Sequence, residues 1–289
     1  MSFLSMTIAP NLDPANLLPQ FESSLPASLR LSGEHALLRF HDLTRETYTT
    51  ERFLSDSPTA DALLLNAIPT ESGRLLHCEA GGPALVSFCT ERGIKLADNA
   101  YAEQASKLLE IALSDVIKPL PFLWTTVSEL VWCCHVVFAQ ADDYDVSFSD
   151  PGIPFSVFVS APAQHDRLAV LRVAENLVHE TMHLQLTLFE DLCPLIDRDS
   201  GWSMYSPWKQ EQRPAQGILH GLYVFYILRW MWLQISQTTH CSTDRDFALR
   251  RILDIDGEID AVRALEDSPA LTEAGKRFLQ ELFVSRLKQ

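Results

Sequence analysis

Apolar residues recur at helical spacing through most of the chain beyond residue 98. One such pattern follows Asn99, a candidate N-cap residue, and a second predicts a helix from about Leu123 to Gln140. From Asp166 onward the patterns are again helical, and Asp166 can cap a helix of about 26 residues that is apolar on most of its faces. A helix with so little polar surface is expected to be buried.

Two other parts of the chain have a different pattern. Between His35 and Thr90 the apolar runs are short and are separated by proline and glycine, which favours short strands or mixed small elements. Residues 153–160, IPFSVFVS, are rich in β-branched and aromatic residues, which is typical of a strand. We therefore predict a mainly α fold with a small β component (α+β), in which a buried helical core carries the long helix after Asp166.

The charge balance narrows the range of partners. The chain has 289 residues with 23 Lys and Arg against 38 Asp and Glu, which gives a net charge of −15. Nucleic acids and anionic membranes both require clustered cations, so neither is expected as a partner. The six cysteines form no CxxC pair, and the N-terminus lacks the features of a signal peptide. Both observations indicate a cytoplasmic protein with reduced cysteines.

Two apolar stretches are long enough to resemble membrane spans, but each contains ionisable residues. Residues 119–139 include Glu129, and residues 218–235 include Arg229. A charge at the bilayer centre costs about 3 kcal/mol on insertion scales, so both stretches are interpreted as buried core helices. The four aspartates within residues 141–151 are interpreted as a solvated acidic loop.

The strongest chemical signal is an HExxH motif, His179-Glu180-Thr181-Met182-His183, within the long predicted helix. The two histidines are one turn apart on the same face, so their imidazoles can bind one divalent metal ion. Glu180 lies about 100° around the helix from His179, which places it beside such an ion rather than on it. It can act as a general base on a metal-bound water, or it can orient a ligand or a substrate.

The third metal ligand decides which chemistry the motif performs. The residues after the motif lack the glycine and histidine of the metzincin pattern, and Glu190, Glu211 and Glu258 are interpreted as solvated carboxylates. Glu190 is also about 10 Å along the helix from His183. His220 is the favoured third ligand, because it lies near the start of a very apolar helix, where a polar group needs a partner. Core packing with a backbone hydrogen bond is the alternative for His220.

A cationic and aromatic loop precedes His220. Two prolines impose extended or turn backbone on this loop, which presents Tyr205, Lys209 and Arg213 close to the predicted ligand helix in sequence. Arginine can hold a carboxylate through two hydrogen bonds, whereas lysine acts as a point charge. These residues are candidates for cofactor binding, and simple solvation of the two cations is the alternative.

The combination LVHETMH … YSPWKQEQRPAQGILHGLYVF resembles the HExxH-type family of iron- and 2-oxoglutarate-dependent peptide β-hydroxylases. Members are typically found beside precursors of ribosomally synthesised, post-translationally modified peptides (RiPPs). The similarity covers about residues 151–232, and its YSPW, RP and LHG-Y-F elements are more specific than HExxH alone. It implies His179, His183 and His220 as Fe(II) ligands, 2-oxoglutarate and O₂ as co-substrates, and hydroxylation at a β-carbon of a precursor peptide.

The same resemblance suggests roles for the loop and for the two halves of the chain. We assign Arg213 to the 2-oxoglutarate carboxylate, with Lys209 as the alternative and Tyr205 beside them. Lys209 stands where arginine is expected after YSPW, and lysine cannot reproduce a bidentate contact. Residues 1–98 are expected to form an N-terminal arm and a small mixed α/β region, a candidate peptide-docking part, and residues 99–289 a helical metal-binding catalytic region.

Two other functions remain open at this point. A zinc-dependent HExxH peptidase would use Glu180 as its general base and would cleave peptides without 2-oxoglutarate. A non-catalytic peptide-binding protein would keep the HExxH residues only as a structural metal site.

Overall fold

A computed structural model describes residues 63–70, 75–80, 83–138, 145–150, 156–162 and 166–287. These residues fold mainly as α-helices with a small β component, as predicted. They divide into two compact units: unit 1 comprises residues 185–229 and 252–287, and unit 2 comprises residues 63–184 and 230–251, with the gaps given above. The predicted N-terminal arm and the apolar run at residues 35–41 lie outside the described residues.

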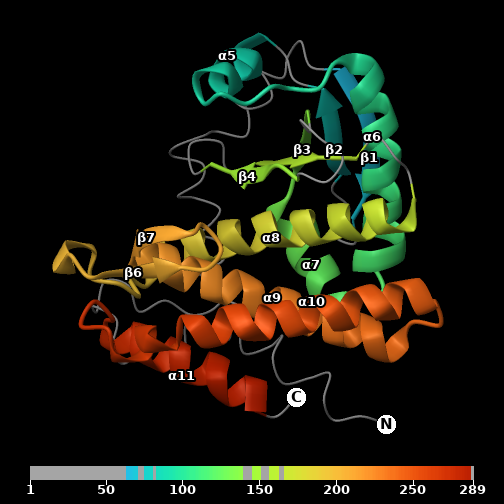
Figure 1. Cartoon of the computed structure of the whole chain (residues 1–289). Coiled ribbons are helices and arrows are strands. Elements are labelled where there is room, and N and C mark those ends of the chain that lie inside the picture. Colours follow the sequence, from blue (N-terminus) through green and yellow to red (C-terminus); the bar gives the residue numbers. More distant parts are fainter. Residues whose placement is uncertain are drawn as a thin grey trace. The chain divides into compact units, whose positions relative to one another are not determined.

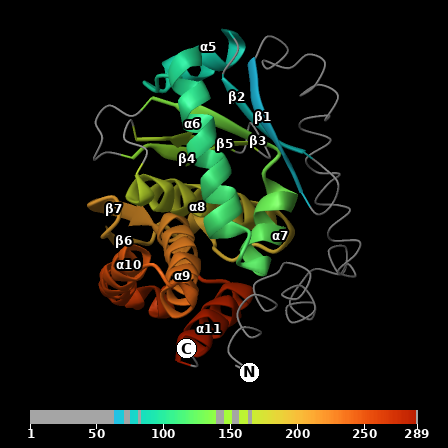
Figure 2. The same ribbon diagram turned by 90° about the vertical axis from the view of Figure 1, so that its right-hand side faces the viewer.

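Unit 2 contains a five-stranded sheet in the order β1-β2-β3-β5-β4, in which Figure 1 labels β1 to β4 and Figure 2 also labels β5. The three central strands are parallel and the two outer strands are antiparallel to their neighbours. Every residue of β3 and β5 is buried, as expected for parallel strands that are covered on both faces. The strands are β1 (Leu63–Pro69), β2 (Leu75–Ala80), β3 (Cys133–Val137), β4 (Ser147–Ser149) and β5 (Ser156–Ser160).

The prediction of a helix from about Leu123 to Gln140 is wrong for the second half of that range. The helix α7 (Pro121–Leu130) begins at a proline, which suits the first turn, and β3 follows it after two residues. A strand that is buried on both faces has an unbroken apolar run, and periodicity alone does not separate such a run from a buried helix. The predicted strand within residues 153–160 is confirmed by β5.

Two helices of unit 2 pack beside the sheet. The helix α6 (Asn99–Ile111) contacts β1, β2 and β3 (Figure 2) and continues as a π-helical segment, η2 (Ala112–Ile117). Its N-cap is Asp98, whose side chain accepts a hydrogen bond from the backbone of Tyr101, so the prediction of Asn99 as the cap is off by one residue. The run predicted as a short element at residues 84–89 forms the helix α5 (Pro83–Glu91).

The strand register separates two faces of this sheet. Directly paired residues point to the same side, and neighbours along a strand point to opposite sides. Glu79 pairs with His135, His135 with Phe158, and Phe158 with Phe148, so these four residues share one face, which we call the histidine face. Ser147 and Ser149 flank Phe148 and therefore project from the opposite face, which we call the serine face.

The acidic loop is only partly described, and its described part is not simply solvated. Asp145 accepts two hydrogen bonds from Arg172, at 2.9 and 2.8 Å, and Asp150 lies 3.5 Å from Arg92. The prediction of a solvated loop is therefore wrong for these two carboxylates. The other aspartates of the segment lie outside the described residues.

Three long helices have residues in both units. They are α8 (Arg167–Leu192), α9 (Ala215–Thr238) and α10 (Ser242–Ala261). The predicted cap of α8 is confirmed, because Asp166 Oδ1 accepts a hydrogen bond from the backbone of Ala169 at 2.8 Å. Among the described residues, α9 is the one helix long and apolar enough to cross a membrane, and it is mostly buried, as a core helix of a soluble protein would be.

Unit 1 combines parts of these helices with a hairpin and a C-terminal helix. The hairpin consists of β6 (Ser203–Ser206) and β7 (Glu211–Pro214), and the last helix is α11 (Glu273–Leu287). Gly275 of α11 packs against the backbone of Leu195, because a β-carbon at position 275 would lie 2.1 Å from the Leu195 carbonyl oxygen. Short 3-10 turns cover Arg198–Ser200 and Arg263–Asp267.

The division of the chain into residues 1–98 and 99–289 stays a prediction. The sheet of unit 2 takes β1 and β2 from the first range and its other strands from the second. A peptide-docking role for the first range rests on no described contact.

Candidate metal centre

The helix α8 holds the HExxH motif in unit 2, and His179 and His183 meet there. Their Nε2 atoms are 3.2 Å apart, and the ring centroids are 4.8 Å apart with the planes inclined by 64°. Both rings are partly buried. The helical spacing therefore directs the same nitrogen of each imidazole toward one point, as the sequence predicts.

The distance between these nitrogens suits two ligands of one ion. Nitrogens that bind one ion at about 2.0–2.1 Å lie about 2.9–3.4 Å apart for bond angles between octahedral and tetrahedral. The observed separation of 3.2 Å falls within that interval. Imidazole is a suitable ligand for iron and for zinc, so the pair alone does not select between these metals.

Glu180 is held by two hydroxyl groups from the serine face of the sheet. Ser147 Oγ donates to Oε1 at 2.8 Å, and Ser149 Oγ donates to Oε2 at 3.0 Å. The glutamate side chain is only 5% exposed, and its Oε1 lies 3.9 Å from His179 Nε2. Each carboxylate oxygen thus has a fixed donor, which orients the group beside the histidine pair and compensates for its burial.

In unit 1, His220 has a carboxylate partner. Its Nε2 lies 2.9 Å from Glu190 Oε2, which also accepts a hydrogen bond from Gln216 at 2.9 Å. Glu190 is only 3% exposed, so its interpretation as a solvated carboxylate is wrong. The reason is tertiary, since the start of α9 packs against the end of α8 within this unit. His220 thus has a side-chain partner within this unit, and its role as the third metal ligand stays a prediction.

The other two nominal carboxylates differ from each other. Glu211 is exposed, as predicted, and pairs with Arg213 at 3.0 Å. Glu258 is partly buried and accepts a hydrogen bond from the indole of Trp208 at 3.1 Å, so its interpretation as a solvated group is wrong.

The predicted cationic loop is the β6–β7 hairpin of unit 1. Tyr205 and Lys209 are exposed, and the Arg213 side chain is 42% exposed, with its guanidinium on Glu211. Trp208 lies flat on Phe225, with ring centroids 5.1 Å apart. A β-carbon at Gly221 would be 2.4 Å from the Trp208 ring, so only glycine allows this approach to α9.

The structure thus groups the predicted residues by unit. His179, His183 and Glu180 come together in unit 2, while His220 and the hairpin residues belong to unit 1. Sequence reasoning missed Ser147 and Ser149, although their spacing of two in an SFS strand signals that both point to one face. It also missed Gln216 and the burial of Glu190, for which no local signal exists.

The chain matches no known protein-family model, and no curated protein sequence matches it.

Proposed function

We propose that the protein is an Fe(II)- and 2-oxoglutarate-dependent enzyme that hydroxylates a β-carbon in a ribosomally made precursor peptide. The observation that carries the proposal is the convergence of His179 Nε2 and His183 Nε2 at 3.2 Å on a buried helix. Two imidazole nitrogens at this spacing fit a divalent first-row metal. The resemblance of the YSPW, RP and LHG-Y-F elements to the hydroxylase family supports this function over others that use an HExxH motif.

In this proposal the three residues of the motif have separate tasks. His179 and His183 hold Fe(II), which when bound supplies the redox chemistry that couples 2-oxoglutarate and O₂ to hydroxylation. Glu180, with a serine donor on each oxygen, keeps a fixed orientation beside His179 and acts as a positioning residue. The resemblance adds His220 as the third ligand, and its carboxylate contact is of the kind that orients metal-binding histidines.

The hairpin supplies the residues proposed for 2-oxoglutarate. Arg213 offers a planar set of donors that matches a carboxylate, and it already binds one from Glu211. A carboxylate of 2-oxoglutarate would replace that intramolecular partner. Lys209 is the alternative cation, and Tyr205 is an exposed aromatic side chain on the same hairpin. The substrate peptide and the cytoplasmic location are part of the same proposal.

In the zinc-peptidase alternative, Glu180 would act as the general base instead of an orienting residue. A general base must accept a proton from a metal-bound water, and it does this best with an accessible oxygen. Both oxygens of Glu180 already accept hydrogen bonds, and the side chain is buried. These hydrogen bonds support an orienting role for Glu180 in the proposed hydroxylase, and the measurement of metal and 2-oxoglutarate binding separates it from the peptidase.

The test is anaerobic titration of the purified metal-free protein with Fe(II), followed by 2-oxoglutarate, recorded by visible absorption. We expect a weak charge-transfer band that requires both additions. His179→Ala should abolish the band, and Arg213→Lys should raise the 2-oxoglutarate concentration needed to produce it. His240→Ala, which removes an exposed histidine between α9 and α10, is the matched control and should leave the band unchanged.

Two outcomes would contradict the proposal. One is a protein that gives no band and instead retains stoichiometric zinc on His179 and His183. The other is a band that is unaffected by His179→Ala. If His220→Ala alone leaves the band intact, the hydroxylase proposal stands and the assignment of His220 as the third ligand falls.

A further inference from the structure

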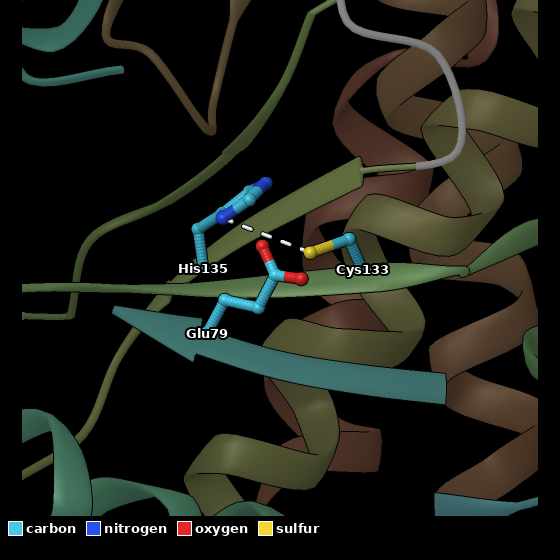
Figure 3. Close-up of side chains that lie close together, drawn as sticks. All are labelled: Glu79, Cys133 and His135. Carbon is cyan, nitrogen blue, oxygen red and sulfur yellow. Dashed lines mark hydrogen bonds between the residues drawn. The ribbon is translucent and has the colours of Figure 1, made fainter. Parts of the chain in front are cut away.

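A second group of metal-ligand side chains lies on the histidine face of the unit 2 sheet. Glu79 comes from β2, and Cys133 and His135 come from the neighbouring strand β3 (Figure 3). Their ligand atoms all lie within 4.8 Å of one another, and His135 Nδ1 is 3.8 Å from Cys133 Sγ. Cys133 and His135 are buried, and Glu79 is partly buried.

The group is incompletely satisfied by the protein itself. Within the described parts of the chain, Glu79 Oε2 is one of six buried side-chain nitrogen and oxygen atoms without a hydrogen-bond partner, and it belongs to this cluster. His135 turns Nδ1 toward Cys133 (Figure 3), and its unpaired Nε2 is at the other end of the ring. An unpaired buried polar atom costs about 1–3 kcal/mol, so native proteins rarely keep one without a reason such as a bound water or ion. Burial also lowers the pKa of His135 to about 3, so its ring is neutral at pH 7, the form in which imidazole binds metals.

The spacing and the donor types fit zinc. A thiolate at about 2.3 Å and an imidazole nitrogen at about 2.0–2.1 Å from a tetrahedral zinc ion are about 3.6 Å apart. The observed separation of 3.8 Å needs only a small adjustment. A thiolate and a carboxylate together carry two negative charges, which a divalent cation neutralises in this buried position.

His77 is a fourth candidate ligand. It pairs in register with Cys133 and lies two residues before Glu79, so it belongs to the same face. Its Nδ1 is 3.7 Å from Glu79 Oε1, and its side chain is 34% exposed. Strands β2 and β3 thus each provide two donors at alternate positions, and an ion among them would join two parallel strands that are far apart in sequence.

We propose that Glu79, Cys133 and His135, with His77, bind a structural zinc ion that is separate from the metal of the HExxH motif. The two sites use different strands and helices, and the register places them on opposite faces of one sheet, since Glu180 is bound from the serine face. Zinc binding replaces the thiol proton of Cys133, because the thiolate is the ligand.

Cobalt(II) substitution tests this proposal directly. Cysteine thiolate bound to Co(II) gives a charge-transfer band in the near ultraviolet, whereas the HExxH residues contain no sulfur ligand. The measurement uses the full chain carrying His179→Ala and His183→Ala, so that only the proposed site remains. We expect one equivalent of Co(II) to produce the band and zinc to displace it.

The matched pair of variants is Cys133→Ala and Cys134→Ala. These cysteines are neighbours on β3 but point to opposite faces of the sheet. Cys133→Ala should abolish the band, and Cys134→Ala should keep it. No band in the parent protein, or a band that is lost with Cys134→Ala and kept with Cys133→Ala, overturns the proposal.

A second variant covers the case in which Cys133→Ala does not fold. Glu79→Gln keeps the shape of the side chain and removes its charge, and its position is partly solvent-accessible. We expect the thiolate band to persist while the affinity for Co(II) falls by about 10- to 100-fold. An unchanged affinity would overturn the assignment of Glu79 as a ligand, and the absence of a thiolate band in a folded Glu79→Gln protein and in the parent would overturn the zinc site.

Discussion

The two faces of the unit 2 sheet differ in how completely their glutamate side chains are hydrogen-bonded. On the serine face, Glu180 is buried, and each of its oxygens accepts a hydrogen bond from a serine. On the histidine face, Glu79 and His135 are also largely buried, yet one polar atom of each lacks a partner within the described residues. Glu180 is buried and fully hydrogen-bonded, whereas Glu79 is partly buried and keeps one unpaired oxygen.

This difference separates two kinds of polar site. A carboxylate with a donor on every oxygen is positioned by the protein alone, so it can remain fixed while another group beside it reacts or binds. A cluster that keeps unpaired atoms is complete only with something added from solution. This difference is the basis on which we propose an orienting role for Glu180 and a ligand role for Glu79.

The largest expected effect is the loss of stability on removal of zinc from the histidine face. In the protein that carries His179→Ala and His183→Ala, free zinc at a thousand times its dissociation constant should stabilise the folded state by about 4 kcal/mol. Removal of the zinc with a chelator should lower the free energy of unfolding by that amount. Urea unfolding with and without chelator measures this loss. Cys133→Ala should be insensitive to chelator. If chelator destabilised the protein equally with and without Cys133→Ala, the metal would lie outside the histidine face, and the contrast between the two faces would not hold.

The serine face should depend on its hydroxyls and not on metal. Ser147→Ala with Ser149→Ala leaves the buried Glu180 carboxylate without these donors, so the free energy of unfolding should fall by about 3 kcal/mol. Adding Glu180→Leu removes the unpaired charge and should recover most of the loss. Chemical denaturation of the three proteins measures both steps. A double variant as stable as the parent would mean that the hydroxyls do not hold the carboxylate.

The pH dependence of stability should identify His135. In the metal-free protein its pKa is lowered by burial to about 3, so below about pH 6.5 the unfolded chain binds a proton that the folded chain does not. Stability is therefore lost as the pH falls from about 6.5 toward 3, and it should drop by about 1.4 kcal/mol between pH 7 and 5.5. His135→Phe, which can stack on Phe158, should flatten this part of the curve. The same slope in both proteins would exclude His135 as its cause.

The ion pair between Arg167 and Asp244 provides a reference for the size of these stability changes. The hydrogen bonds from Arg167 lower the pKa of Asp244, so their contribution is present above about pH 3.8 and is lost as the pH falls through the folded pKa. Because the Arg167 side chain is 35% exposed, Asp244→Asn should cost only about 1 kcal/mol at pH 7. Exposed Asp246 provides the control substitution Asp246→Asn. A cost at pH 7 that persists undiminished at pH 2 would contradict the ionic assignment.

Local signals in the sequence predicted the parts of the structure that depend on local physics. The cap at Asp166, the extent of α8 and the shared face of His179 and His183 all follow from residues within a few turns of one another. Burial of residues 218–235 follows from their composition in the same way. The chemistry assigned to these residues, including iron and 2-oxoglutarate, stays a prediction.

The features that were missed depend on contacts between distant segments. Cys133–Val137 was predicted as helix because a central strand and a buried helix have the same unbroken apolar run. Glu190 was predicted as solvated because nothing near it in sequence indicates that Gln216 and His220 will approach it. The Glu79 cluster needs the register between β2 and β3, which the sequence does not specify.

The contact between Trp208 and Gly221 packs the hairpin closely against the start of α9. The indole is fixed on one side by Phe225 and at its nitrogen by Glu258, and the absent side chain at position 221 lets it touch the helix. The tryptophan therefore joins the hairpin turn that contains Lys209 to the turn of α9 that contains His220, and a bulkier residue at position 221 would separate them.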